Sequence, residues 1–199
     1  MQAHLKRLPP APTTEEATRA GAGRTSRGNG TGQPPTGRVE PPSLRTTQYT
    51  EGDLFRVSVP SNWRELPGSS AVTFAPPGAF GTLNGQGVFT HGVEIGSSRH
   101  ETHDLQTSTD ELINSLAGGN PGLRRAAGYE RIAFAGRNAL RTALSNRSEA
   151  TGRPETIELY TARLRDGSLF YVLGVAPTDE FRDYTGVFDR VVRSLKIND

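Results

Sequence analysis

The sequence predicts an α/β (α+β) fold: a three-layer αβα sandwich with a mainly antiparallel sheet, preceded by a disordered N-terminal tail. The longest apolar run, Leu169–Ala176, is rich in β-forming residues and apolar on both sides, which is typical of a central strand covered on both faces. The predicted strands follow one another through short turns, which favours antiparallel pairing. Two segments, around Leu112–Leu116 and over Phe181–Leu195, have the apolar spacing of amphipathic helices and supply the outer layers.

The first 48 residues have the composition of a linker. They contain 7 of the 14 prolines, and between Pro9 and Ser43 the only large aliphatic residue is Val39. Such a segment cannot bury enough apolar surface to offset the entropy lost on ordering. We therefore expect residues 1–48 to form a disordered, basic, Pro/Gly-rich linker and residues 49–199 to form one folded domain.

The charge of the chain divides at the same boundary. Residues 1–48 carry seven Lys or Arg and three Asp or Glu, a net charge of +4, whereas residues 49–199 carry 16 and 18, a net charge of −2. A nucleic-acid-binding domain concentrates basic residues in its folded part, so we expect no nucleic-acid partner.

The chain has no cysteine, which excludes disulfides and thiol catalysis. We expect neither a signal peptide nor membrane insertion, because the first nine residues lack an apolar core and no run approaches the roughly 18 apolar residues of a membrane span.

Turn residues mark the order of the elements. Leu54–Val59 alternates between apolar and polar residues, as a half-buried strand does. Thr107 or Ser108 is expected to cap the first helix, which Gly118-Gly119-Asn120-Pro121 stops, and Thr178 is expected to cap the second. Further strands are expected at Ala71–Ala75, Phe89–Ser97, Glu130–Ala135, Ala139–Asn146 and Ile157–Arg165.

A hairpin is predicted where Ile157–Arg165 leads into the long apolar run. The dipeptide Asp166-Gly167 between them tolerates the positive φ angles of a two-residue type I′ turn. Such a turn fixes the register, and a slip of one residue would move every side chain to the other face. The expected pairs are Leu164 with Leu169, Ala162 with Tyr171 and Tyr160 with Leu173.

One histidine-rich stretch could carry chemistry. His100-Glu101-Thr102-His103-Asp104 places two imidazoles three residues apart, whereas a His-Glu-x-x-His metal site needs four. We interpret the stretch as a polar loop with solvated histidines, because a zinc site also needs converging ligands and supporting hydrogen bonds. The alternative is an enzyme or metal protein that uses His91, His100 and His103.

The remaining candidate residues have structural interpretations. Gly81–Gly87 lacks the Lys-Ser/Thr of a phosphate-binding loop and precedes a strand, so we expect a mobile hairpin loop. Glu94 and Glu158 are expected to be outward-facing strand carboxylates rather than an acid/base pair. Arg124-Arg125 is expected to be a solvated pair, with an acidic partner as the alternative, and Trp63 to fill the core or its rim. We predict no catalytic, cofactor-binding or metal-binding residue and no cofactor.

Two stretches near the ends of the folded part have a recognisable order. Phe55-Arg56-Val57-Ser58-Val59-Pro60-Ser61-Asn62-Trp63 is a strand followed by Pro-x-x-Trp, and Leu169–Val172 precedes a helix that ends in Val191–Ile197. Both resemble the corresponding parts of PsbP-like domains. More narrowly, residues 54–197 are similar to the C-terminal accessory domain of bacterial, especially acidobacterial, HtpX-like zinc metallopeptidases (peptidase family M-48). The phrases that carry this similarity are Thr90-His91-Gly92, His103-Asp104-Leu105, Thr109–Ile113, Asn120-Pro121, Glu149–Gly152 and Arg165–Tyr171, and the opening Leu5–Pro10 resembles the end of the catalytic part.

This resemblance implies a three-layer αβα fold and a binding or assembly role. It does not bring peptidase chemistry, because this chain contains neither the His-Glu-x-x-His motif nor its third ligand. We expect a non-catalytic accessory domain whose partner is a protein, either the peptidase domain or its substrates, in the periplasm or another extracytoplasmic compartment. The alternative is a free-standing PsbP-like assembly or binding factor. The oligomeric state and the binding face stay open.

Overall fold

Strand β12 (Leu169–Pro177) lies in the middle of the larger sheet, and all nine of its residues are buried. The burial of this strand confirms the prediction of a central strand covered on both faces. The computed structural model describes residues 35, 38–68, 70–83, 85–100 and 104–198.

Every strand pair of the larger sheet is antiparallel. The strand order is β3-β4-β7-β12-β11-β10-β8, and β9 also pairs with β10. The strands are β3 (Arg64–Pro67), β4 (Ala71–Ala75), β7 (Gly92–Ser98), β8 (Arg124–Arg125), β9 (Glu130–Phe134), β10 (Arg137–Arg147) and β11 (Pro154–Arg163).

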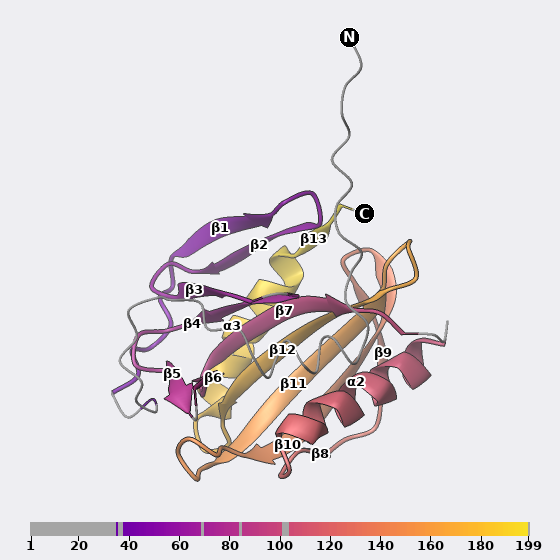
Figure 1. Ribbon diagram of the computed structural model, residues 1–199. Coiled ribbons are helices and arrows are strands. Elements are labelled where there is room, and N and C mark those ends of the chain that lie inside the picture. The colour runs from indigo at the N-terminus through magenta and orange to yellow at the C-terminus, as the bar shows by residue number, and fades with distance from the viewer. Residues whose placement is uncertain (1–34, 36–37, 69, 84, 101–103, 199) are drawn as a thin grey trace.

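The two helices cover opposite faces of this sheet (Figure 1). Helix α2 (Leu105–Gly119) packs against β10, β11 and β12 through a core that includes Leu112, Leu159 and Tyr171. Helix α3 (Phe181–Ser194) packs against β12 and the smaller sheet, through a core that includes Phe170 and Phe188. Alternate residues of β12 enter different cores, so the predicted three-layer αβα arrangement is confirmed.

A second sheet joins the two ends of the domain on the α3 side. Its order is β1 (Thr46–Glu51), β2 (Phe55–Pro60) and β13 (Lys196–Ile197). The predicted strand at residues 54–59 is present as β2, and its buried Phe55, Val57 and Val59 contribute to the α3-side core.

The hairpin between β11 and β12 differs from the prediction by one residue. Its loop has three residues, because Leu164 N donates to Ser168 O at 2.9 Å and Gly167 occupies the left-handed region with φ 87°. The Asp166 carboxylate accepts from Ser168 N at 2.9 Å and thereby supports this longer turn. Tyr160 and Ala162 consequently share the α3-side face with Phe170 and Val172, and not, as predicted, the face of Tyr171 and Leu173. The observed pairs are Arg163 with Leu169, Ala162 with Phe170 and Tyr160 with Val172.

A two-residue turn with positive φ angles occurs instead between β9 and β10. Ala135 (φ 49°) and Gly136 (φ 76°) occupy it, and Phe134 pairs with Arg137. These angles are those of the type I′ hairpin that we predicted for Asp166-Gly167.

Both predicted N-caps are wrong. Asp104 caps α2: its carboxylate accepts from Thr107 N at 2.7 Å, so that Thr107 and Ser108 lie inside the helix. Glu180 is the N-cap of α3 and makes no side-chain capping bond, while Thr178 pairs with Thr156 at 3.0 Å. The predicted stop of α2 is confirmed, since the helix ends at Gly119.

The predicted domain boundary at residue 48 falls inside β1, which begins at Thr46. The preceding residues are bound to the domain: Asn62 accepts from Ser43 N and donates to Pro41 O, both at 2.9 Å. A Cβ at Gly78 (φ 85°) would lie 2.6 Å from Arg38 O, so the backbone crosses this glycine directly. The predicted linker up to residue 34, together with residues 36 and 37, lies outside the described residues.

The glycine-rich stretch forms strands where a loop was expected. β5 (Phe80–Leu83) pairs with β6 (Gln86–Phe89) as a separate two-stranded sheet. The predicted strand Phe89–Ser97 is accordingly divided at Thr90-His91, where the chain passes from β6 into β7.

Candidate functional site

Polar side chains form several hydrogen-bonded clusters around the larger sheet. The first surrounds His91, whose Nε2 lies 3.1 Å from Glu180 Oε2 and whose Nδ1 lies 2.9 Å from Thr90 Oγ1. A neutral imidazole that donates to Glu180 accepts from the Thr90 hydroxyl. Arg153 joins the cluster through Nη2, which lies 2.7 Å from both Asp179 Oδ1 and Glu180 Oε1. The cluster thus ties the start of β7 to the β10–β11 loop and the start of α3.

Burial determines the charge of this cluster. The His91 side chain is only 3% exposed and packs against the Tyr184 ring, and burial lowers its pKa below 6.5 although Glu180 opposes the shift. Burial also disfavours ionisation of Glu180, but the hydrogen bonds from Arg153 and His91 outweigh it and hold the pKa of Glu180 below its usual value. Neutral His91 beside ionised Glu180 is therefore the resting state near neutral pH.

A second cluster lies where β7 leads toward α2. His100 Nε2 lies 2.8 Å from Ser98 Oγ, and its Nδ1 lies 2.8 Å from Glu111 Oε2. The order hydroxyl, imidazole, carboxylate has the connectivity of a nucleophilic relay. Acyl transfer also needs oxyanion donors and room for a substrate. Two surface hollows of the described chain lie elsewhere, one around Arg137 and Arg165 and the other around Arg56 and Lys196.

The two described candidate zinc ligands do not converge. His91 and His100 flank opposite ends of β7, whose seven residues span about 23 Å at 3.3 Å per residue. His103 lies outside the described residues. Within the part of the chain that the structure describes, no group of three or more His, Asp or Glu side chains could hold a metal ion.

The expectation that Glu158 faces outward is wrong. Its residue is 5% exposed on β11, and its carboxylate forms an ion pair with Arg141, whose Nε lies 2.7 Å from Oε1. The guanidinium of Arg141 also lies over the Tyr160 ring and 3.5 Å from Glu130. Because β11 is interior to the sheet and covered on both faces, alternation alone could not reveal this burial.

Glu94 does not point freely into solvent, as was expected, but is hydrogen-bonded to neighbouring strands. It is partly buried on β7, where it accepts from Tyr171 Oη at 2.9 Å and is 3.5 Å from Thr73 Oγ1. Burial raises the pKa of Glu94, and both hydrogen bonds oppose the shift. Tyr171 reaches it across Gly96, where a Cβ would lie 2.7 Å from the phenolic oxygen.

The other sequence candidates have local partners. Arg125 Nη1 lies 3.1 Å from Asp110 Oδ1 and the guanidinium lies over Tyr129, while Arg124 donates to the carbonyl of Pro121. Trp63 is 7% exposed in the α3-side core, as expected of a core residue.

Within the described chain, neither helix is long and apolar enough to cross a membrane.

Sequence reasoning missed the residues that complete these clusters. Glu180 lies 89 positions from His91, and Tyr171 lies 77 positions from Glu94. Only the pairing of distant strands brings them together. No spacing within the sequence signals such contacts.

Comparison with solved structures identifies the fold as PsbP-like. The solution structure of cyanobacterial PsbP (CyanoP) from Synechocystis sp. PCC 6803 is similar with a TM-score of 0.54 and 13% identity, covering 82% of this chain and 99% of that chain. The Saccharomyces cerevisiae Ran-binding protein Mog1p has a TM-score of 0.55 at 9% identity, covering 79% and 97%. A protein from Bacteroides thetaiotaomicron has 0.53 at 12%, covering 78% of this chain and 50% of that chain. No family model and no curated protein matches the chain.

Proposed function

We propose that this chain is a non-catalytic accessory module that binds protein, and that it forms the C-terminal part of an exported zinc metallopeptidase of family M-48. The observation that carries the proposal is the anchored entry of the chain. Asn62, which belongs to the Pro-x-x-Trp stretch, clamps Pro41 and Ser43 by two hydrogen bonds of 2.9 Å. A chain that arrives from the N-terminal side therefore meets the domain at a fixed point, an arrangement that suits a module on a tether.

The fold likenesses support a binding role. Mog1p, described as Ran-binding, has a similar fold, which is consistent with the use of this architecture for protein recognition. Fold alone does not determine function, so the proposal also depends on the resemblance of residues 54–197 to peptidase accessory domains. Its partner would be the peptidase domain or its substrates, in the periplasm or another extracytoplasmic compartment.

Genomic context tests the link to a peptidase. The proposal predicts that the reading frame continues upstream into a domain with a His-Glu-x-x-His motif. An in-frame stop codon and a separate ribosome-binding site would instead support the alternative, a free-standing PsbP-like assembly or binding factor.

One observation favours a second candidate function, an acyl-transferring hydrolase. Ser98, His100 and Glu111 are linked by two hydrogen bonds of 2.8 Å in the order of a nucleophilic relay. A fluorophosphonate probe separates the two functions, because it labels only an activated serine. The accessory module predicts no labelling; labelling that is lost in Ser98→Ala and in His100→Ala would establish the hydrolase.

A further inference from the structure

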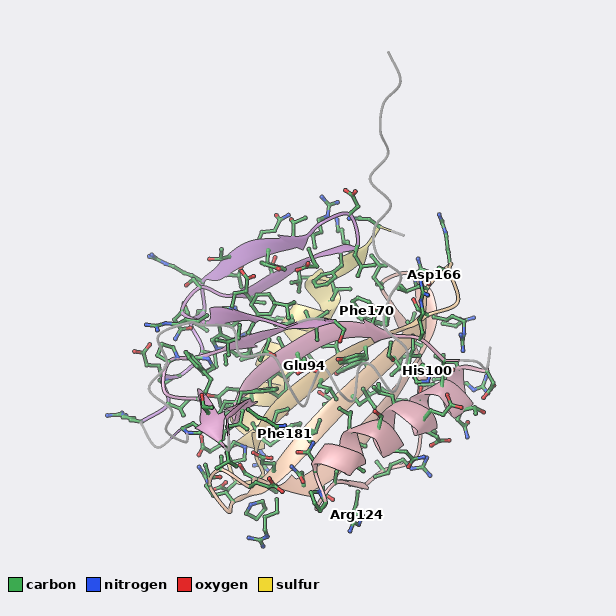
Figure 2. All side chains as sticks on the ribbon, in the orientation of Figure 1. Glu94, His100, Arg124, Asp166, Phe170 and Phe181 are labelled. Atoms are coloured by element: carbon green, nitrogen blue, oxygen red, sulfur yellow. The ribbon has the colours of Figure 1, made fainter. Side chains whose placement is uncertain are left out.

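The smaller sheet turns one face to the core and the other to solvent. Phe55 of β2 packs against Phe170 of the larger sheet, with 5.6 Å between the ring centroids, and Phe170 lies beneath the smaller sheet in the view of Figure 2. Arg56 follows Phe55 along the strand, so it points to the opposite, outer face. The sheet lies at the margin of the domain (Figure 1), and Arg56 is exposed.

Two cations lie directly opposite each other on this outer face. Arg56 pairs with Lys196 of β13 in the antiparallel ladder, so both side chains share the face. Both residues are exposed, and within the described chain neither side chain forms a hydrogen bond or an ion pair. Arg141 and Arg153, by contrast, are paired with carboxylates. Like charges directly opposite each other in a sheet repel, and an anion bound between them would remove that repulsion.

The two cations border a small, open hollow of about 270 Å³. Ser194, the last residue of α3, closes one side, where its Oγ accepts from Ser58 N at 2.9 Å. Gln48 of β1 pairs with Ser58, and its exposed amide, like the two cations, forms no hydrogen bond within the described chain. The hollow thus offers three exposed donor side chains, two of them charged. It is lined by Gln48, Arg56, Val57, Ser58, Ser194 and Lys196.

This hollow suits a carboxylate side chain better than other ligands. Pockets for small molecules are mostly apolar and roughly 300–1,000 Å³ in volume. Sites for nucleic acids combine a basic stripe with aromatic side chains, whereas the lining of this hollow has no aromatic residue and residues 49–199 carry a net charge of −2. A carboxylate, in contrast, can accept two parallel hydrogen bonds from an arginine and another from a lysine.

We propose that the outer face of the smaller sheet binds an acidic segment of a partner protein, with an aspartate or glutamate held between Arg56 and Lys196. The amide of Gln48 donates to the same segment, and the exposed Thr46 and Thr50 of β1 lie beside it on the same face. This inference rests on the proposed binding function and specifies the chemistry of the partner.

Nuclear magnetic resonance tests the inference, because it reports where a peptide binds. The isotope-labelled intact chain is titrated at low salt with Gly-Ser-Glu-Ser-Glu-Ser-Gly, and the matched peptide carries glutamine in place of glutamate. Site-resolved amide shifts are needed because the basic residues 1–48 also attract acidic peptides. We expect saturable shifts at residues 48, 56, 58, 194 and 196. The acidic peptide should bind there about tenfold more tightly than its match, as two exposed ion pairs allow, and added salt should weaken it.

The test variant combines Arg56→Gln with Lys196→Gln and should lose the preference for the acidic peptide. The matched control combines Arg131→Gln with Arg182→Gln, which removes two exposed positive charges from β9 and from the start of α3. The control should bind like the wild type. Thermal unfolding should show that both variants are folded, since none of the four side chains is bonded within the described chain.

Several results would overturn the inference. These are shifts confined to residues 1–48, equal affinity for the two peptides, and unchanged binding when Arg56 and Lys196 are replaced. Tighter binding of inorganic phosphate or of a single-stranded oligodeoxynucleotide at the hollow would also overturn it, because the site would then serve another anion. All these results leave the proposed function standing if the intact chain still binds the proposed peptidase domain.

Discussion

The imidazole of His91 and the carboxylate of Glu180 lie 3.1 Å apart and connect β7 with α3 across 89 positions of sequence. The imidazole is almost fully buried, whereas Glu180 is 40% exposed and held by Arg153. Solvent thus reaches Glu180 but not His91, and protonation of His91 is coupled to folding.

This coupling predicts an acid-sensitive stability. The folded pKa of His91 lies below its unfolded value of 6.5, so the unfolded chain takes up the proton first. The stability contributed by neutral His91 is complete above pH 6.5 and is lost as the pH falls from 6.5 through the lowered folded pKa. Urea unfolding between pH 4.5 and 8 should show this loss, and His91→Gln should reduce the slope. Identical pH profiles for wild type and variant would contradict the prediction.

Glu94 predicts a pH dependence of the opposite sign. Its folded pKa lies above the unfolded 4.5, so its favourable contribution is present below pH 4.5 and lost as the pH rises through the raised folded pKa. Glu94→Gln should therefore be more stable than wild type at pH 7, by about 1 kcal/mol on the scale of a desolvated polar group. The difference should vanish in acid, as measured by urea unfolding. A less stable variant at pH 7 would show that the charge is compensated.

Gly174 predicts a steric limit between β12 and α3. A Cβ at this position would lie 2.8 Å from the Phe188 ring, so Gly174→Ala should destabilise the domain by about 1–3 kcal/mol through overpacking. Combination with Phe188→Leu should cost less than the sum of the single changes.

The control for this prediction is Gly186→Ala in α3. The nearest atom that a Cβ would meet there is Arg190 Nη1, at 3.8 Å, and alanine favours a helix over glycine by about 1 kcal/mol. We expect a modest stabilisation in thermal unfolding. Equal effects of Gly174→Ala and Gly186→Ala would contradict the close packing of β12 on α3.

The Asn62 clamp predicts a proteolytic signature. Asn62→Ala removes both hydrogen bonds to residues 41 and 43. The loss should lower the free energy of unfolding by about 1–2 kcal/mol and detach the segment that precedes β1 from the domain. Trypsin should then cleave at Arg38 and Arg45 faster than in wild type, as followed by mass spectrometry. Asn138→Ala, at an exposed position of β10, is the control; equal cleavage in both variants would argue against the clamp.

The sequence predicted most of the fold because period and composition report burial directly. The apolar run of β12, the alternation of β2 and the stripe of α3 are all present. The register between β11 and β12 could not be predicted, because Asp166-Gly167 is compatible with a two-residue turn and also with a three-residue turn in which Gly167 is left-handed. The difference of one residue placed each side chain of β11 on the opposite face, relative to β12, from the one predicted.

The polar clusters escaped prediction for a different reason. Alternation indicates which residues share a face but not whether that face is covered, so Glu94 and Glu158 were assigned to solvent. Asp104 was not predicted as the N-cap of α2, because Thr107 and Ser108 follow it and are equally plausible capping residues from their spacing to later acidic residues. Packing between distant elements decided both questions.

The central claim is that this domain binds a protein and performs no reaction of its own. The most direct measurement is calorimetric titration of the intact chain with the peptidase domain that we propose to lie upstream, purified separately. The account predicts saturable one-to-one binding. No heat of binding with either that domain or its protein substrates would contradict it.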